Sequence, residues 1–143
     1  MPRSVSSDMG RNWTVSESPF DPLSGGQRST IRRIGDDVLM FVSFTPGSQF
    51  TADAGDEFEG RGMFAAVSFD EGETWPLRKL VSDNGPERTL DGGAWTREFT
   101  MSKYSAEPKG YLTSYQGADG TIHLISSMLH YRFSESWLTG KRR

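Results

Sequence analysis

The sequence contains no cysteine among its 143 residues, which excludes disulfide bonds, thiolate metal ligands and cysteine nucleophiles. It also lacks a long apolar run. The longest, residues 38–42, is far shorter than the ~18 residues that a membrane-spanning helix needs, so we expect no membrane span. A basic excess is missing too, because 19 acidic residues outweigh 16 lysines and arginines and give a net charge of −3. Nucleic acid is therefore not an expected partner.

Several common site motifs are also missing. The chain carries no glycine-rich phosphate loop and no G-x-S-x-G nucleophile elbow. Its two histidines, His123 and His130, have no carboxylate at ligand spacing. Four acidic residues of one segment lack the spacing of a calcium loop, namely Asp53, Asp56, Glu57 and Glu59. We therefore predict no metal and no cofactor, and the sequence does not indicate a cellular compartment.

The chain is instead rich in turn formers, with 16 glycines and seven prolines. Short segments with β-branched and aromatic residues recur between them and are typical of strands. The predicted strands are residues 30–34, 38–44, 63–69, 75–81, 111–116, 121–127 and 131–133. No apolar period of 3.6 residues holds for three turns, and residues 134–138 allow one helical turn at most. The sequence predicts an all-β fold.

Two long polar segments interrupt these strands. Residues 45–61 are polar and acidic, and a loop of this length is often functional. A plain solvated surface loop is the equally open alternative. Residues 83–97, rich in glycine and charge, lead into the next hairpin.

Two octets of the chain align with each other. Residues 6–13 read SSDMGRNW and residues 68–75 read SFDEGETW, so both follow the pattern S-x-D-x-G-x-[NT]-W. In a tight turn of this composition the aspartate accepts backbone N–H groups, the glycine supplies a positive φ, and the tryptophan begins the next strand. The repetition favours an architecture of repeated four-stranded units such as a propeller.

This octet resembles the Asp-box, or BNR repeat, of the sialidase-like (neuraminidase) six-bladed β-propellers. The matching residues are Ser6, Asp8, Gly10, Trp13, Ser68, Asp70, Gly72 and Trp75. In that family the box lies at the periphery of a blade, so the resemblance implies a structural role for these residues.

Other segments carry the same resemblance. Residues 26–33 with 39–43 look like the opening hairpin of an internal blade, and residues 110–125 look like the closing blade. Residues 130–133 with 137–138 look like the C-terminal strand and tail of bacterial exo-α-sialidase homologues.

The resemblance implies a partial β-propeller, about two to three blades of six, in a C-terminal fragment that forms one domain. Residues 1–20 would supply the last strand of one blade, residues 21–82 a full blade and residues 83–143 a final partial blade. The first arginine of the substrate clamp and the catalytic aspartate would lie in the missing N-terminal blades. Those blades would be the fragment's natural partner.

The resemblance also implies a nucleophile. Sialidase-like enzymes use a tyrosine activated by a glutamate, because an anionic sugar repels a carboxylate nucleophile. Tyr111 stands where the G-Y strand of the family places that tyrosine, and Glu107 lies four residues earlier in a loop that could turn back on it. The alternative is that the Tyr111 ring packs at the start of a strand.

A cluster of arginines would bind the carboxylate of the sugar. The candidates are the arginines in polar loops just before predicted strands: Arg28, Arg61 and Arg97. The alternative for each is an ordinary surface arginine.

The preferred function is therefore the C-terminal part of a sialidase-like glycoside hydrolase of the exo-α-sialidase type. When intact it would hydrolyse terminal acidic sugars of glycoconjugates, with the fragment alone expected to be inactive. One alternative is a non-catalytic BNR propeller module that binds carbohydrate or protein. Another is a truncated chain without a function of its own.

Overall fold

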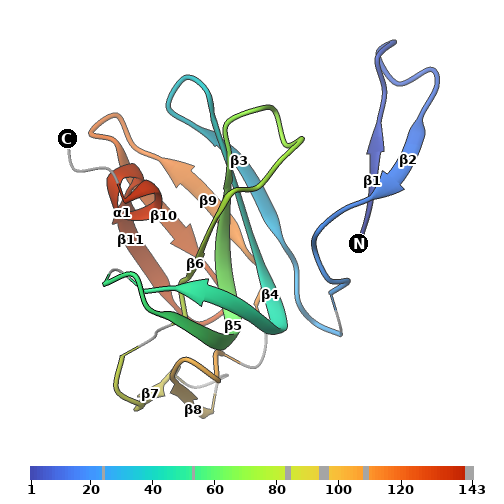
Figure 1. Cartoon of the computed structure of the whole chain (residues 1–143). Helices are drawn as coiled ribbons and strands as arrows, with labels where there is room; N and C mark the ends of the chain where they lie inside the picture. The colour runs from blue at the N-terminus through green and yellow to red at the C-terminus, as the bar shows by residue number, and fades with distance from the viewer. Residues whose placement is uncertain (24, 53, 83–84, 94–96, 108–109, 141–143) are drawn as a thin grey trace.

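The computed structural model describes residues 1–23, 25–52, 54–82, 85–93, 97–107 and 110–140. Within them the chain forms eleven strands in four antiparallel sheets and one short helix (Figure 1). The all-β prediction is confirmed. These described sheets do not close into a propeller ring, so the partial propeller stays a prediction. None of the described helical residues belongs to a helix long and apolar enough to cross a membrane.

The largest sheet has four strands in sequential order: β3 (Thr30–Ile34), β4 (Val38–Thr51), β5 (Glu57–Ser68) and β6 (Leu77–Leu80). β3 has the predicted bounds. The central parts of β4 and β5 are buried on both faces of the sheet, which is why they read as continuous apolar runs rather than as an alternation.

The prediction of a long loop over residues 45–61 is wrong. β4 continues to Thr51 and β5 begins at Glu57, so the two strands extend their antiparallel ladder beyond the core, with a shift of register after Thr45. Phe50 and Phe58 pair across this arm with ring centroids 5.9 Å apart. Polar residues form strand here because the ladder satisfies their backbone groups, whatever their side chains.

The second main sheet has three strands, β9 (Thr113–Gln116), β10 (Thr121–Ile125) and β11 (His130–Ser134), in the order β11-β10-β9. The helix α1 (Glu135–Thr139) follows directly and forms the single turn that the sequence allows. Ser134 caps it by accepting a hydrogen bond from the N–H of Trp137.

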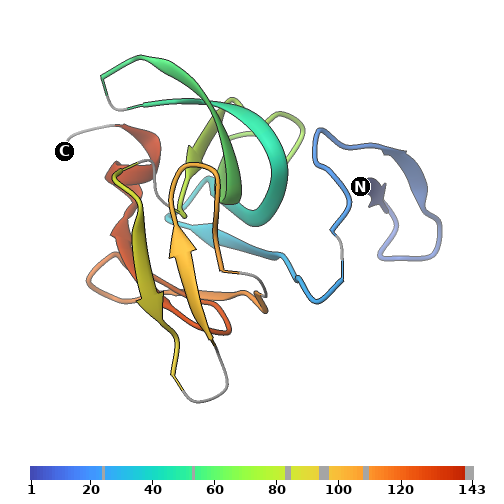
Figure 2. The ribbon, with the colours of Figure 1, turned by 90° about the horizontal axis from the view of Figure 1, so that it is seen from below.

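Two smaller hairpins complete the fold, β1 (Pro2–Val5) with β2 (Thr14–Glu17), and β7 (Arg88–Asp91) with β8 (Glu98–Met101). These four strands lie outside the predicted ones, because each has only four residues and β1, β2 and β7 are mostly exposed. The β1–β2 hairpin stands apart from the main body, whereas the β7–β8 hairpin lies below the two main sheets (Figures 1 and 2).

The core consists of two clusters on opposite faces of β4 and β5. The first joins the four-stranded sheet to the three-stranded sheet and helix α1, and contains Ile34, Val38, Met40, Val42, Phe44, Met63, Ala65, Val67, Leu112, Ile122, Leu124 and Leu138. The second connects the other face of the four-stranded sheet to the chain after β2, and contains Phe20, Phe41, Phe50, Phe64, Ala66 and Leu80.

The first strands of the two main sheets, β3 and β9, lie side by side. Arg28 and Tyr111, just before these strands, form an isolated parallel bridge. Further along, the Arg32 side chain donates from Nε to the carbonyl oxygen of Ser114 over 2.7 Å. β3 and β9 therefore run in the same direction, each as the first strand of its own antiparallel sheet.

Candidate functional site

The antiparallel order separates two ends of the main sheets. The β3–β4, β5–β6 and β9–β10 turns lie at one end. The starts of β3 and β9, the β4–β5 arm and the β10–β11 turn lie at the other. Among the sequence-predicted residues, the second octet lies at the first end, and Arg28 and Tyr111 lie at the second.

The octet of residues 68–75 forms the β5–β6 turn. Ser68 donates its hydroxyl to Asp70 Oδ1 over 2.7 Å and accepts the N–H of Gly72 over 2.8 Å. Asp70 also accepts the Thr74 hydroxyl (2.6 Å) and the Thr74 backbone N–H (2.8 Å). These hydrogen bonds favour the ionised carboxylate and lower the pKa of Asp70 to about 2.

The octet of residues 6–13 forms the same turn between β1 and β2. Asp8 accepts the Asn12 backbone N–H (2.9 Å) and its side-chain amide (2.6 Å), which lowers the pKa of Asp8 to about 2. The φ angles are 59° at Met9 and 84° at Gly10, and they take the same two values at the corresponding positions of the second octet. Both carboxylates are engaged within their turns, as a structural role requires.

The two octet tryptophans differ in their surroundings. Trp75 packs at the edge of the second cluster, with its ring centroid 5.1 Å from that of Phe20 and 5.9 Å from that of Phe41. Trp13 is exposed, and its indole N–H donates to the Gly10 carbonyl oxygen over 3.1 Å. Ser6, like its counterpart in the second octet, bonds the carboxylate two residues on.

At the opposite end, Tyr111 lies beside Arg28. The Tyr111 residue is 57% exposed, and the guanidinium carbon of Arg28 lies 5.2 Å from its ring centroid, within range of a cation–π interaction. The Arg28 backbone N–H donates to the Gly110 carbonyl oxygen over 2.7 Å. A Cβ atom at Gly110 would lie 2.2 Å from Cζ of Phe44, so only glycine fits directly before the tyrosine.

Glu107 is buried at the same end, with 2% of its surface exposed. One carboxylate oxygen, Oε2, accepts the Ser126 hydroxyl over 2.6 Å, and Oε1 has no hydrogen-bond partner among the described residues. Removal from water penalises the charged form and raises the pKa of Glu107. Glu107 is thus a buried carboxyl group that keeps one oxygen free for a further donor.

The β10–β11 turn connects Glu107 to Tyr111. Ser126 holds the Glu107 carboxylate, and the next residue, Ser127, accepts the Tyr111 backbone N–H at its hydroxyl over 3.1 Å. No hydrogen bond between described residues joins the Tyr111 hydroxyl to the Glu107 carboxylate. Neither serine stands out in the sequence, because the pattern predicts a strand that includes both. Their signal is local, since Ser126 also accepts the N–H of Leu129 and so forms the turn.

The other two predicted arginines lie elsewhere. Arg61 is on β5, and its guanidinium lies 3.6 Å from Oε1 of Glu59. Arg97 is exposed directly before β8. Among the described contacts, none joins either side chain to Arg28 or Tyr111, so their roles in binding stay predictions.

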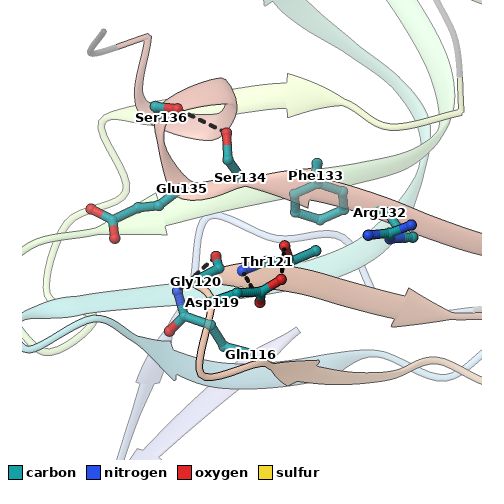
Figure 3. A pocket seen from close by; sticks show the side chains of 9 residues that line it. All are labelled: Gln116, Asp119, Gly120, Thr121, Arg132, Phe133, Ser134, Glu135 and Ser136. Atoms are coloured by element: carbon teal, nitrogen blue, oxygen red, sulfur yellow. Dashed lines mark hydrogen bonds between the residues drawn. The ribbon is translucent and has the colours of Figure 1, made fainter. Parts of the chain in front are cut away.

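A polar pocket of about 440 Å³ lies at the end of the three-stranded sheet that carries the β9–β10 turn (Figure 3). Its lining residues come from the β9–β10 turn and from the junction of β11 with α1: Gln116, Asp119, Gly120, Thr121, Arg132, Phe133, Ser134, Glu135 and Ser136. Asp119 accepts the Thr121 N–H (3.0 Å) and hydroxyl (2.9 Å), which lowers the pKa of the Asp119 carboxyl. Hydrogen-bond donors, hydrogen-bond acceptors and side chains of both charge signs thus surround one cavity.

Among the described residues, no group of three or more histidine, aspartate and glutamate side chains is placed to hold a metal ion. Of the four acidic residues considered from the sequence, Asp53 lies outside the described residues.

Comparisons with protein-family models, with curated proteins and with solved structures find no match for this chain.

Proposed function

We propose that the chain supplies blades of a sialidase-like β-propeller and that the intact protein is a glycoside hydrolase acting on terminal acidic sugars. Three features support the architecture. The β3–β6 sheet is a four-stranded meander, as a blade is. The octets form the same turn in two successive sheets, in the hairpins β1–β2 and β5–β6. The first strands of neighbouring sheets run parallel, as strands around a common axis would.

The observation that carries the proposed activity is the exposed phenol of Tyr111 beside the guanidinium of Arg28, with the buried carboxyl of Glu107 behind the adjoining turn. A neutral phenol can approach an anionic sugar without charge repulsion. A guanidinium presents paired N–H donors that fit a carboxylate. The Tyr111 phenol thus supplies a neutral nucleophile for an anionic sugar, and the Arg28 guanidinium supplies a cation for its carboxylate.

In the proposed reaction Glu107 exchanges its bond to Ser126 for one to the Tyr111 hydroxyl and takes the phenolic proton. The Tyr111 oxygen then bonds to the anomeric carbon as the glycosidic C–O bond breaks. The leaving oxygen takes a proton from a second acid, which the family resemblance places in blades outside this chain. Because burial raises the pKa of Glu107, its carboxylate is a stronger base than an exposed one.

The test compares Tyr111→Phe with Tyr115→Phe in the intact protein that carries this chain. Tyr115 is the matched control, because it lies nearby on β9 and is also exposed, at 66%. With a fluorogenic glycoside of a terminal acidic sugar, Tyr111→Phe should lower kcat by about 10²-fold or more while Tyr115→Phe leaves it unchanged. Equal activity of the two variants would exclude Tyr111 as the nucleophile.

The polar pocket favours a second candidate, a non-catalytic module that binds carbohydrate. Its cavity combines the amide of Gln116, the guanidinium of Arg132 and several hydroxyls, the groups that bind sugar hydroxyls and carboxylates (Figure 3). Saturable sugar binding without turnover, weakened by Arg132→Gln, would favour this candidate over the hydrolase. Isothermal titration with acidic and neutral oligosaccharides measures it.

A further inference from the structure

The outer face of the three-stranded sheet carries two histidines that contact each other. His123 is on β10 and His130 is the first residue of β11, paired in register with Ile125. Nδ1 of His123 lies 3.0 Å from Nε2 of His130, and the rings are stacked with centroids 5.2 Å apart. In this state one of the two nitrogens carries the proton that they share.

The separation of these nitrogens also fits a metal ion. Imidazole nitrogens bind divalent transition metals at about 2.0–2.1 Å, so two neighbouring ligands at a right angle are about 2.9 Å apart, and two tetrahedral ligands about 3.3 Å apart. The observed 3.0 Å lies closest to the right-angled arrangement, which Ni²⁺ and Cu²⁺ prefer. The antiparallel register of β10 and β11 holds the two backbones, and the rings must turn from their mutual hydrogen bond so that both lone pairs face one ion.

We propose that His123 and His130 form a two-histidine site for a divalent late transition-metal ion, with Ni²⁺ and Cu²⁺ bound more tightly than Zn²⁺. Water completes the coordination on the exposed side. The ion replaces the shared proton and joins β10 to β11 through two side chains, so it stabilises the sheet that also carries Tyr111 at its start. This site is independent of the proposed hydrolase activity.

The residues around His123 affect how tightly a cation binds. Arg132 pairs with His123 in register and is exposed, so its cation opposes binding. Tyr115 pairs with His123 from β9 on the other side. Asp119, in the β9–β10 turn, interacts electrostatically with His123 and favours a cation. Replacing Arg132 therefore alters the affinity in a direction opposite to that of replacing a histidine.

The experiment titrates the full chain with Ni²⁺ alone and measures heat of binding. The wild type should bind one ion, and His123→Ala and His130→Ala should each weaken binding about 10²-fold, because the second imidazole no longer binds intramolecularly. Tyr115→Phe should leave the affinity unchanged, and Arg132→Gln should raise it. Acidification should release the ion, since protons compete for the same nitrogens.

A spectroscopic measurement gives the ligand count directly. With one equivalent of Cu²⁺, the electron paramagnetic resonance spectrum should show coupling to two imidazole nitrogens in the wild type and in Arg132→Gln. Each histidine variant should show one. Histidine variants that bind Ni²⁺ as tightly as the wild type, or a wild-type spectrum with fewer than two coupled nitrogens, would overturn the proposal.

Discussion

Single residues of the octets show how a short motif specifies one turn. Asp8 and Asp70 could be predicted from the sequence, because each bonds only to groups within four residues along the chain. Ser126, which bonds to Glu107, could not be assigned in this way, since the two residues meet only after β9 and β10 have formed. Local hydrogen-bond networks are thus predictable from spacing, whereas contacts made by the tertiary fold are not.

The Asp70 carboxylate should make stability depend on pH. Its pKa is lower in the folded chain, about 2 against 3.8, so its stabilising effect is complete above the unfolded value and is lost as the pH falls through about 2. We expect Asp70→Ala to lower the melting temperature by roughly a few degrees at pH 7, with the difference shrinking towards pH 2. Thermal unfolding monitored by circular dichroism measures both.

Glu17→Ala is the control for this prediction. Glu17 is exposed on β2, and its side chain forms no hydrogen bond with the described residues. The Glu17→Ala variant should therefore have the melting temperature of the wild type at pH 7. A pH-independent loss of stability in Asp70→Ala would show that the turn depends on side-chain size rather than on the ionised carboxylate.

Among the elements, the best-predicted strands are those that pack on the core. β3 has the expected bounds, whereas β10 ends at Ile125 because Ser126 begins a turn. The side-chain pattern predicts a loop for the arm of β4 and β5, because its ladder consists of backbone hydrogen bonds that leave little trace in that pattern. The same reason explains why the exposed β1–β2 hairpin lies outside the predicted strands. β7 and β8 escape prediction because each has only four residues, although Phe99 and Met101 of β8 are buried.

Gly110 connects the packing of β4 to the position of Tyr111. A methyl group at this residue would overlap the Phe44 ring, so we expect Gly110→Ala to lower the free energy of unfolding by about 1–3 kcal/mol. Gly25→Ala is the control, since nothing lies within 4 Å of a Cβ atom there. Urea denaturation of both variants measures the difference. Equal stability of the two variants would contradict the prediction, because it would mean that the Phe44 ring can move away from the added methyl group without cost.

At the scale of the whole molecule, the two core clusters have different partners. The first is enclosed between both main sheets and α1, whereas the second packs against the N-terminal segment through Met1, before β1, and Phe20, after β2. The Phe20 ring contacts Phe41 and Phe64 with centroids 4.4 and 5.9 Å away. The strands of the β1–β2 hairpin are almost wholly exposed, so the packing of Met1 and Phe20 at its base is its main apolar attachment to the body.

This difference in packing predicts that the β1–β2 hairpin unfolds locally more often than the central sheet. Amide hydrogens of β1 and β2 should exchange faster than those of the central parts of β4 and β5, because local opening of the hairpin exposes little apolar surface. Phe20→Ala should lower the free energy of unfolding by about 3–5 kcal/mol if the body stays intact around the cavity, and protection from exchange should be lost first in β1 and β2.

Arg3→Ala is the control. It removes the exposed ion pair with Glu73 and should change hydrogen exchange little, since such pairs are screened by water. Hydrogen exchange followed by mass spectrometry resolves the hairpin from the sheets. Uniform protection across β1, β2, β4 and β5, lost together in Phe20→Ala, would instead show that the hairpin and the body unfold as one cooperative unit.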